Sequence, residues 1–167
     1  MKITPRRFAP WLVVLFLIFS GCATKNSVAK EDQESAFIVI RTPSMQYADQ
    51  GFIYKKPDWT KIEIYGMGQP LLSIEINGMN ICMSTFECMS KRDFNAKVLD
   101  AHYPPTLLEH IFRGEAIFDK QGFVPSRDGF SQKVTKKGEY DISYTVTATE
   151  RKFRDKINNI LIKVREQ

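Results

Sequence analysis

Polar and apolar residues alternate with a period of two along several stretches of the chain, and this pattern constrains the fold more than any other. It is clearest in residues 61–65 (KIEIY), 72–76 (LSIEI) and 140–146 (YDISYTV). Successive side chains of a strand point to opposite faces, so the alternation predicts half-buried strands. Asn77-Gly78 favours a tight turn, after which residues 79–83 are expected to return as a partner strand. Strands joined in this way form an antiparallel sheet.

After residue 90 the apolar residues recur with the spacing of a helix, so helices are expected to interrupt the strands. Ser90 and Asp93 resemble a capping box, and apolar residues then recur at helical spacing. Pro104-Pro105 breaks this helix, and residues 106–113 (TLLEHIFR) predict another. Further strands are expected at residues 36–41, 50–54, 129–134, 153–157 and 160–165. This order predicts a mainly β, α+β fold in which the helices cover one face or one end of the sheet.

The start of the chain resembles the targeting segment of a bacterial lipoprotein. Basic residues precede nine apolar ones, residues 11–19 (WLVVLFLIF), a run too short to span a membrane comfortably. Residues 19–22 (FSGC) then resemble a lipobox, so we expect cleavage before Cys22 and lipid attachment to it. An ordinary secretion signal with a chance cysteine, or a signal anchor, would have the same apolar run.

This segment sets the expected domain organisation. Residues 1–21 would be the signal, residues 22–35 the lipidated Cys22 with a polar tether, and residues 36–167 a single domain. Ala23 follows the cysteine, where Asp would resemble a signal for retention in the inner membrane. We therefore expect a lipid anchor on the periplasmic side of the outer membrane.

The charge of the chain does not favour nucleic-acid binding. The formal net charge of +5 falls to +2 without the signal, because Lys2, Arg6 and Arg7 are its three charged residues. No basic cluster with interleaved aromatic residues is evident in the sequence. The remaining Lys and Arg residues read as a solvated surface.

Residues typical of catalysis are sparse. His102 and His110 do not form a metal-ligand motif, no nucleophile or phosphate-binding motif occurs, and the carboxylates are scattered. We therefore expect neither enzymatic activity nor a metal or other cofactor.

Cys82 and Cys88 remain as a pair if Cys22 carries lipid. Export implies an oxidising compartment, so a disulfide between them is one expectation and two unpaired thiols are the other. A metal site is less favoured, because no second pair of ligands accompanies them.

Three stretches carry a resemblance to a known family. They are residues 61–77 (KIEIYGMGQPLLSIEIN), 105–118 (PTLLEHIFRGEAIF) and 153–164 (FRDKINNILIKV). Together with the lipobox and tether, they resemble the LolB receptors of the LolA/LolB fold group in pattern more than in identical residues. The resemblance implies a curved antiparallel half-barrel sheet with a short helical plug on its concave side.

The resemblance also implies a function and candidate sites. A LolB-like receptor accepts lipidated cargo proteins from a periplasmic carrier and inserts them into the outer membrane. Met67 would be the apolar tip of a loop that contacts the membrane. The acyl chains would lie in a cavity lined by Ile62, Ile64, Leu72, Ile74, Ile76, Leu108, Phe112, Tyr144 and Val146.

Two other functions share these patterns. A packed core has the same alternation as a cavity lining, so the chain could equally be a structural or accessory lipoprotein of an envelope assembly. A periplasmic enzyme would need a polar cleft, which the sequence does not locate.

Overall fold

The computed structural model describes residues 32–84 and 86–167, which form one antiparallel open sheet of eleven strands. The strands are β1 (Asp32–Arg41), β2 (Gln46–Lys56), β3 (Trp59–Gly66), β4 (Gln69–Asn77), β5 (Asn80–Met83), β6 (Phe86–Ser90), β7 (Phe123–Ser126), β8 (Gly129–Lys136), β9 (Tyr140–Val146), β10 (Glu150–Asp155) and β11 (Ile160–Glu166). The fold is mainly β, as the alternation predicted.

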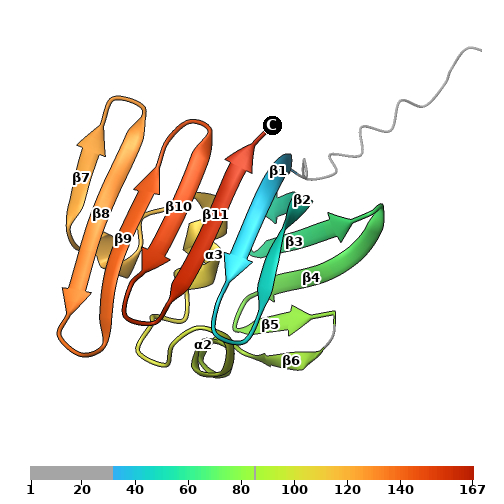
Figure 1. The fold of residues 1–167 in the computed structure, drawn as a ribbon, viewed down its shortest axis with the longest axis horizontal. Coiled ribbons are helices and arrows are strands. Elements are labelled where there is room, and N and C mark those ends of the chain that lie inside the picture. Colours follow the sequence, from blue (N-terminus) through green and yellow to red (C-terminus); the bar gives the residue numbers. More distant parts are fainter. Residues whose placement is uncertain (1–31, 85) are drawn as a thin grey trace, which may run out of the picture.

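The order of the strands places the first beside the last. It runs β6-β5-β4-β3-β2-β1-β11-β10-β9-β8-β7, so every neighbour is consecutive in sequence except β1 and β11 (Figure 1). Their pairing joins Ile38 to Val164 and Ile40 to Ile162. Strands β6 and β7 therefore lie at opposite edges, although they follow each other along the chain.

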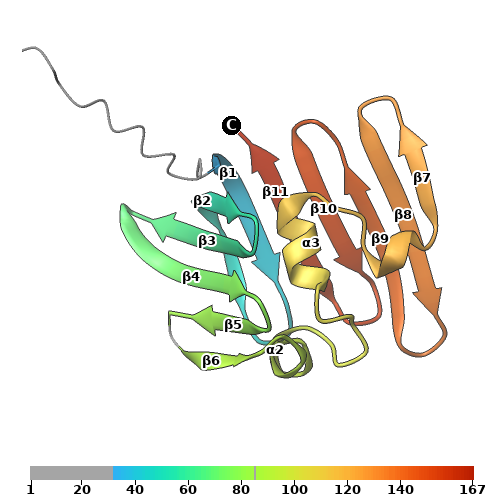
Figure 2. The same ribbon diagram turned by 180° about the vertical axis from the view of Figure 1, so that it is seen from behind.

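The connection from β6 to β7 must cross the sheet from edge to edge, and it contains the helices. These are α2 (Lys91–Val98), α3 (Leu107–Arg113) and the short 3-10 helix η2 (Phe118–Lys120). Figure 2 shows all of them on the same face of the sheet. We call this the helix-covered face and the opposite one the outer face.

Local sequence signals fix the ends of the two α-helices. The Ser90 hydroxyl accepts a hydrogen bond from the backbone N–H of Asp93 at 3.1 Å, which satisfies a free donor of the first turn of α2. Helix α3 ends at Gly114, whose φ of 72° lies in the left-handed region that glycine adopts without strain. Both helices occupy the stretches that the sequence predicted.

The hydrophobic core lies between the helix-covered face and the helices. Alternate residues of the long strands are buried there, among them Ile38, Ile53 and Ile162. Phe94 of α2 and Phe112 of α3 are fully buried against them. The amphipathic helices thus complete a core that the sheet cannot close alone.

Several boundaries differ from those expected. Strand β1 begins at Asp32, so residues 32–35 of the expected tether are part of the sheet. Their polar residues predicted a tether. In the structure, however, Glu34 forms ion pairs with Lys55 and Arg151 rather than facing solvent. Strand β7 (FVPS) was not predicted because all four of its residues are exposed, which leaves no alternation to detect.

Candidate functional site

The β3–β4 hairpin ends in an apolar tip. Gly66 pairs with Gln69, which leaves Met67 and Gly68 as a two-residue turn with φ angles of 50° and 76°. Positive φ angles match the twist of the paired strands, but they cost a residue with a Cβ about 1–2 kcal/mol. The Met67 side chain is fully exposed, and Leu71 on the return strand is 47% exposed. The hairpin therefore presents apolar atoms to solvent at a strained position.

The nine candidate cavity residues come together on the helix-covered face. They belong to β3, β4, α3 and β9, and all nine belong to or pack against one hydrophobic cluster. Eight are at most 1% exposed, and Val146 is half-buried at the edge of the cluster. The alternation therefore identified which side chains point inward.

Four surface pockets are lined by other residues. One of them, of about 290 Å³, lies between the β1–β2 turn, the β5–β6 hairpin and α2. Its lining consists of Ser44, Met45, Tyr47, Met83, Met89, Lys97 and Val98. The other three pockets contain none of the nine candidate residues either. Leu108 and Phe112 of α3 are buried in the same cluster as the strand residues, so the nine side chains form part of one packed core.

Helix α3 is held at its C-terminal end by Arg113. The guanidinium donates to the carbonyl oxygens of Pro57 at 3.2 Å and Trp59 at 3.1 Å, both at the β2–β3 turn. Glu109, one turn earlier, accepts from Arg113 at 3.2 Å and pairs with Lys91 of α2 at 2.7 Å. These polar contacts tie both helices to one end of the sheet, so lifting α3 would require breaking them.

Gln132 of β8 holds the next part of the crossing segment. Its side-chain oxygen accepts from the Ile117 N–H at 2.8 Å, and its amide donates to the carbonyls of Ile117 and Gln121 at 2.9 Å each. The side chain is only 2% exposed and is one of the few polar side chains buried on the helix-covered face. Sequence reasoning missed Gln132, although a Gln in phase with the buried Val134 was a detectable signal.

A third contact joins the loop after α2 to the β10–β11 turn. The Tyr103 hydroxyl donates to Asp155, and the Asn158 amide donates to the same carboxylate at 2.9 Å. Burial and this hydrogen bond raise the pKa of Tyr103, which keeps the hydroxyl protonated as a donor. Three polar contacts therefore fasten the segment that crosses the helix-covered face.

The two remaining cysteines and the two histidines make contacts that stabilise the fold. Cys82 and Cys88 form a disulfide across the β5–β6 hairpin. His102 contacts Asp100 at 2.9 Å, and His110 lies 3.8 Å from Glu115. Within residues 32–84 and 86–167, no group of three or more His, Cys, Asp or Glu side chains is arranged to hold a metal ion.

The expected lipid attachment site, Cys22, lies outside the described residues, as do the signal and residues 22–31 of the tether. In the part of the chain that the structure describes, no helix is both long and apolar enough to cross a membrane. No protein-family model matches the chain, and no curated protein sequence matches it closely enough to identify a relative.

Proposed function

We propose that the chain is a lipid-anchored receptor that accepts lipoproteins from a periplasmic carrier and inserts them into the outer membrane. The sheet would act as a curved half-barrel, with α2 and α3 as the plug on its concave side. The exposed Met67 is the observation that carries this proposal, because a flexible apolar side chain at a strained hairpin tip is suited to entering a bilayer. Cys22 would hold the receptor at the same membrane.

The energetics of such a transfer require an apolar shelter and no covalent chemistry. Burying an acyl chain is worth about 0.8 kcal/mol per CH₂, or roughly 10 kcal/mol for a chain of palmitate length. A lipoprotein therefore cannot cross water with its chains exposed. Movement of α3 would uncover Leu72, Ile74 and their neighbours, and closure would return the acyl chain to the bilayer. This role needs neither a catalytic residue nor a cofactor.

Depletion of the protein from cells that produce it tests the proposal. Other lipoproteins should then accumulate in the periplasm or the inner membrane, as measured by fractionation. The Met67→Glu variant should fail to restore sorting, because a carboxylate at the tip disfavours entry into the bilayer. Met79→Glu is a matched control, since Met79 is also exposed, at 81%, but lies on the β4–β5 turn. Normal sorting after depletion would rule the receptor role out.

Lipid attachment has its own test. Cells supplied with labelled palmitate should incorporate the label into the chain, and Cys22→Ser should abolish the incorporation. The labelled chain should fractionate with the outer membrane, in keeping with Ala23. Incorporation that persists in Cys22→Ser would place the lipid elsewhere.

The burial of the candidate residues favours a second function. Eight of the nine are at most 1% exposed, and a structural or accessory lipoprotein with a permanently closed core would have the same packing. That protein would bind no fluorescent fatty acid and would co-purify with a stable envelope partner. If the native chain binds the fatty acid and the core variant Phe112→Trp binds it more weakly, the receptor function is favoured instead.

A further inference from the structure

The outer face of the sheet carries a row of cations that comes from strands far apart in the sequence. Leu161 of β11 lies opposite Arg41 on one side and Arg154 on the other. Ser143 of β9 lies next to Arg154, and Lys133 of β8 lies next to Ser143. One row across five strands therefore contains three positive charges separated by Leu161 and Ser143.

The adjacent row repeats the pattern. Lys163 of β11 lies directly opposite Lys152 of β10, and the row continues through Thr145 and Ser131. Like charges opposite each other in a sheet are destabilising, and Glu150 pairs with Lys163 alone, at 2.9 Å, which leaves the charge of Lys152 unbalanced. An anionic partner on the outer face would balance that charge.

The excess of positive charge is confined to one half of the outer face. The outward-facing cations of β1, β8, β9, β10 and β11 are Arg41, Lys133, Lys152, Arg154, Lys163 and Arg165, against Asp141 and Glu150. Both acids already face a cation, since Asp141 lies 3.9 Å from Lys156 and Glu150 lies 2.9 Å from Lys163.

The other half of the outer face is electrically balanced. Strands β2, β3 and β4 carry Lys56 and Lys61 there, against Glu63 and Glu75. Lys61 pairs with Glu63 at 2.6 Å. In contrast, Arg41, Lys133, Lys152 and Arg154 have no ion-pair partner among the residues that the structure describes. The basic half is therefore a local feature and does not reflect the net charge of the chain.

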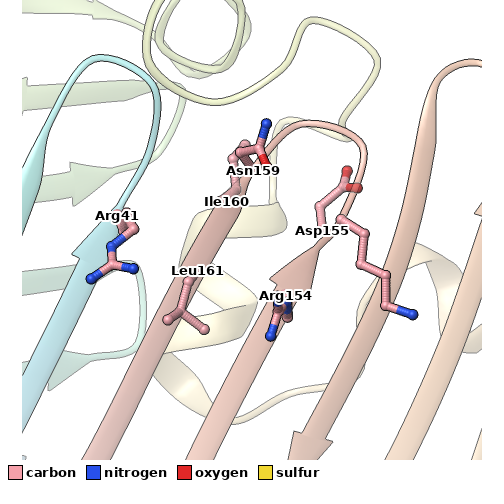
Figure 3. Close-up of a pocket in the computed structure, with 7 residues that line it drawn as sticks. Arg41, Arg154, Asp155, Asn159, Ile160 and Leu161 are labelled. Carbon is pink, nitrogen blue, oxygen red and sulfur yellow. The ribbon is translucent and has the colours of Figure 1, made fainter.

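The first row also includes a pocket large enough for a phosphate group. It has a volume of about 230 Å³, and its lining includes the cations Arg41, Arg154 and Lys156 beside a single carboxylate, that of Asp155. Figure 3 shows Arg41 and Arg154 on either side of Leu161. Arginine is suited to such a group because its planar guanidinium can bind two phosphate oxygens at once.

We propose that the outer face of β8–β11 and β1 is a docking surface for the headgroups of anionic phospholipids. The cations are spread over rows that also contain Ser131, Ser143 and Thr145, and the apolar side chains beside them on β1 and β11, Phe37, Val39 and Leu161, are half-buried rather than exposed as anchors of the kind that dominates protein interfaces. A layer of many phosphates fits this diffuse pattern better than a single acidic protein. The surface is separate from the Met67 tip, and the proposal stands whether or not the protein transfers lipoproteins.

The test uses the full chain reconstituted into vesicles, with an environment-sensitive fluorophore on Ser143→Cys between Arg154 and Lys133. The label should shift to the blue with vesicles of phosphatidylcholine and phosphatidylglycerol, and not with phosphatidylcholine alone. High salt should reverse the shift by screening the charges. A chain labelled without Ser143→Cys gives the background from Cys22.

Charge-neutral variants make the test specific. Each of Arg41→Gln, Lys152→Gln and Arg154→Gln should lower the ratio of docked to undocked chains about five-fold. The control is Arg92→Gln with Lys120→Gln, which removes exposed cations from the helix-covered side and should leave the ratio unchanged. These substitutions are at exposed positions without ion pairs among the described residues, so they should not unfold the protein.

Two outcomes would overturn the proposal. An equal label response in both kinds of vesicle would show that charge does not bring this face to the membrane. The second outcome is no label response with either kind of vesicle, together with binding of an acidic protein that Arg154→Gln abolishes. It would assign the face to a protein partner. Neither outcome would affect the lipoprotein sorting test, so failure of this proposal and failure of the receptor role are distinguishable.

Discussion

At the scale of single residues, Asp155 is the carboxylate on which the β10–β11 turn depends. It accepts hydrogen bonds from the Tyr103 hydroxyl, the Asn158 amide and the backbone N–H groups of Asp141 and Ile157. Burial raises the pKa of Asp155, but the hydrogen bonds outweigh burial and hold the pKa below its ordinary value. The ionised carboxylate is therefore the form that the fold favours.

Removal of the Tyr103 hydroxyl should destabilise the protein. A hydrogen bond to a charged group contributes about 1.5–3 kcal/mol, so Tyr103→Phe should lower the free energy of unfolding by this amount in urea titrations. Tyr47→Phe is the control, because the structure shows no hydrogen bond from the Tyr47 hydroxyl within the described residues. Equal stabilities of the two variants would contradict the role given to Tyr103.

The lowered pKa of Asp155 predicts the direction of a pH effect. In the unfolded chain the carboxyl pKa is about 3.9, so the contribution of Asp155 to stability is present above that pH. It is lost as the pH falls further, through the lower pKa of the folded state. The free energy of unfolding, measured in urea over a series of acidic pH values, should therefore fall less steeply with acidification in Asp155→Asn than in the native sequence. Parallel pH profiles would show that Asp155 does not contribute.

At the scale of elements, the crossing segment from α2 to η2 is held by polar side chains as well as by the core. Gln132 satisfies the backbone groups of Ile117 where the segment reaches β8. The disulfide between Cys82 and Cys88 closes the β5–β6 hairpin at the start of the same segment. The two ends of the segment are thus fixed by different kinds of interaction.

Loss of the Gln132 side chain should loosen the segment locally. Gln132→Ala leaves the buried N–H of Ile117 without its partner, which costs about 1–3 kcal/mol, whereas the Ile117 carbonyl still accepts from the Lys120 N–H at 3.0 Å. Hydrogen exchange should become faster in residues 115–122, while exchange in β3 and β4 stays slow. Gln50→Ala, at an exposed position on β2, should change neither region. Uniformly faster exchange in Gln132→Ala would indicate a global effect instead.

Opening the disulfide should have a moderate effect on stability. Six positions separate Cys82 from Cys88, and closure of so short a loop is worth about 2 kcal/mol in the chain-entropy model. The double variant Cys82→Ser, Cys88→Ser should therefore unfold at lower urea concentration. The native chain under reducing conditions should show the same loss, whereas the double variant should be insensitive to the reductant. A native chain with unchanged stability on reduction would contradict this expectation.

At the scale of the whole molecule, the pairing of β1 with β11 makes one sheet from two sets of strands. Ile40 and Ile162 meet across this seam and are almost fully buried. The helices then pack over both sets, so the two halves share one core. We expect the halves to unfold together.

A cavity at the seam tests this cooperativity. Ile162→Ala should lower the free energy of unfolding by about 2–5 kcal/mol, because it removes buried methyl groups from a packed core. Hydrogen exchange in β3 and in β9 should accelerate by the same factor. Ile157→Ala, at a position that is 46% exposed, should have little effect. Acceleration confined to β9–β11 would mean that the halves unfold separately.

Local patterns in the sequence determined the mainly β class, the inward-facing residues such as Ile62 and Ile74, and both helices, together with the Ser90 cap of α2. These features depend on neighbours within a few positions, so period and capping residues are sufficient to predict them. The sequence also placed Met67 in a turn between two strands.

Only the tertiary structure decided which distant segments lie side by side. The β1–β11 pairing, the edge-to-edge crossing and the Gln132 contacts all join residues that no local period connects. The same holds for the basic rows, because Arg41, Lys133 and Arg154 look scattered until the strand order brings them onto one face. Pairing between remote strands is set by the packing of the whole core, which local periodicity does not encode.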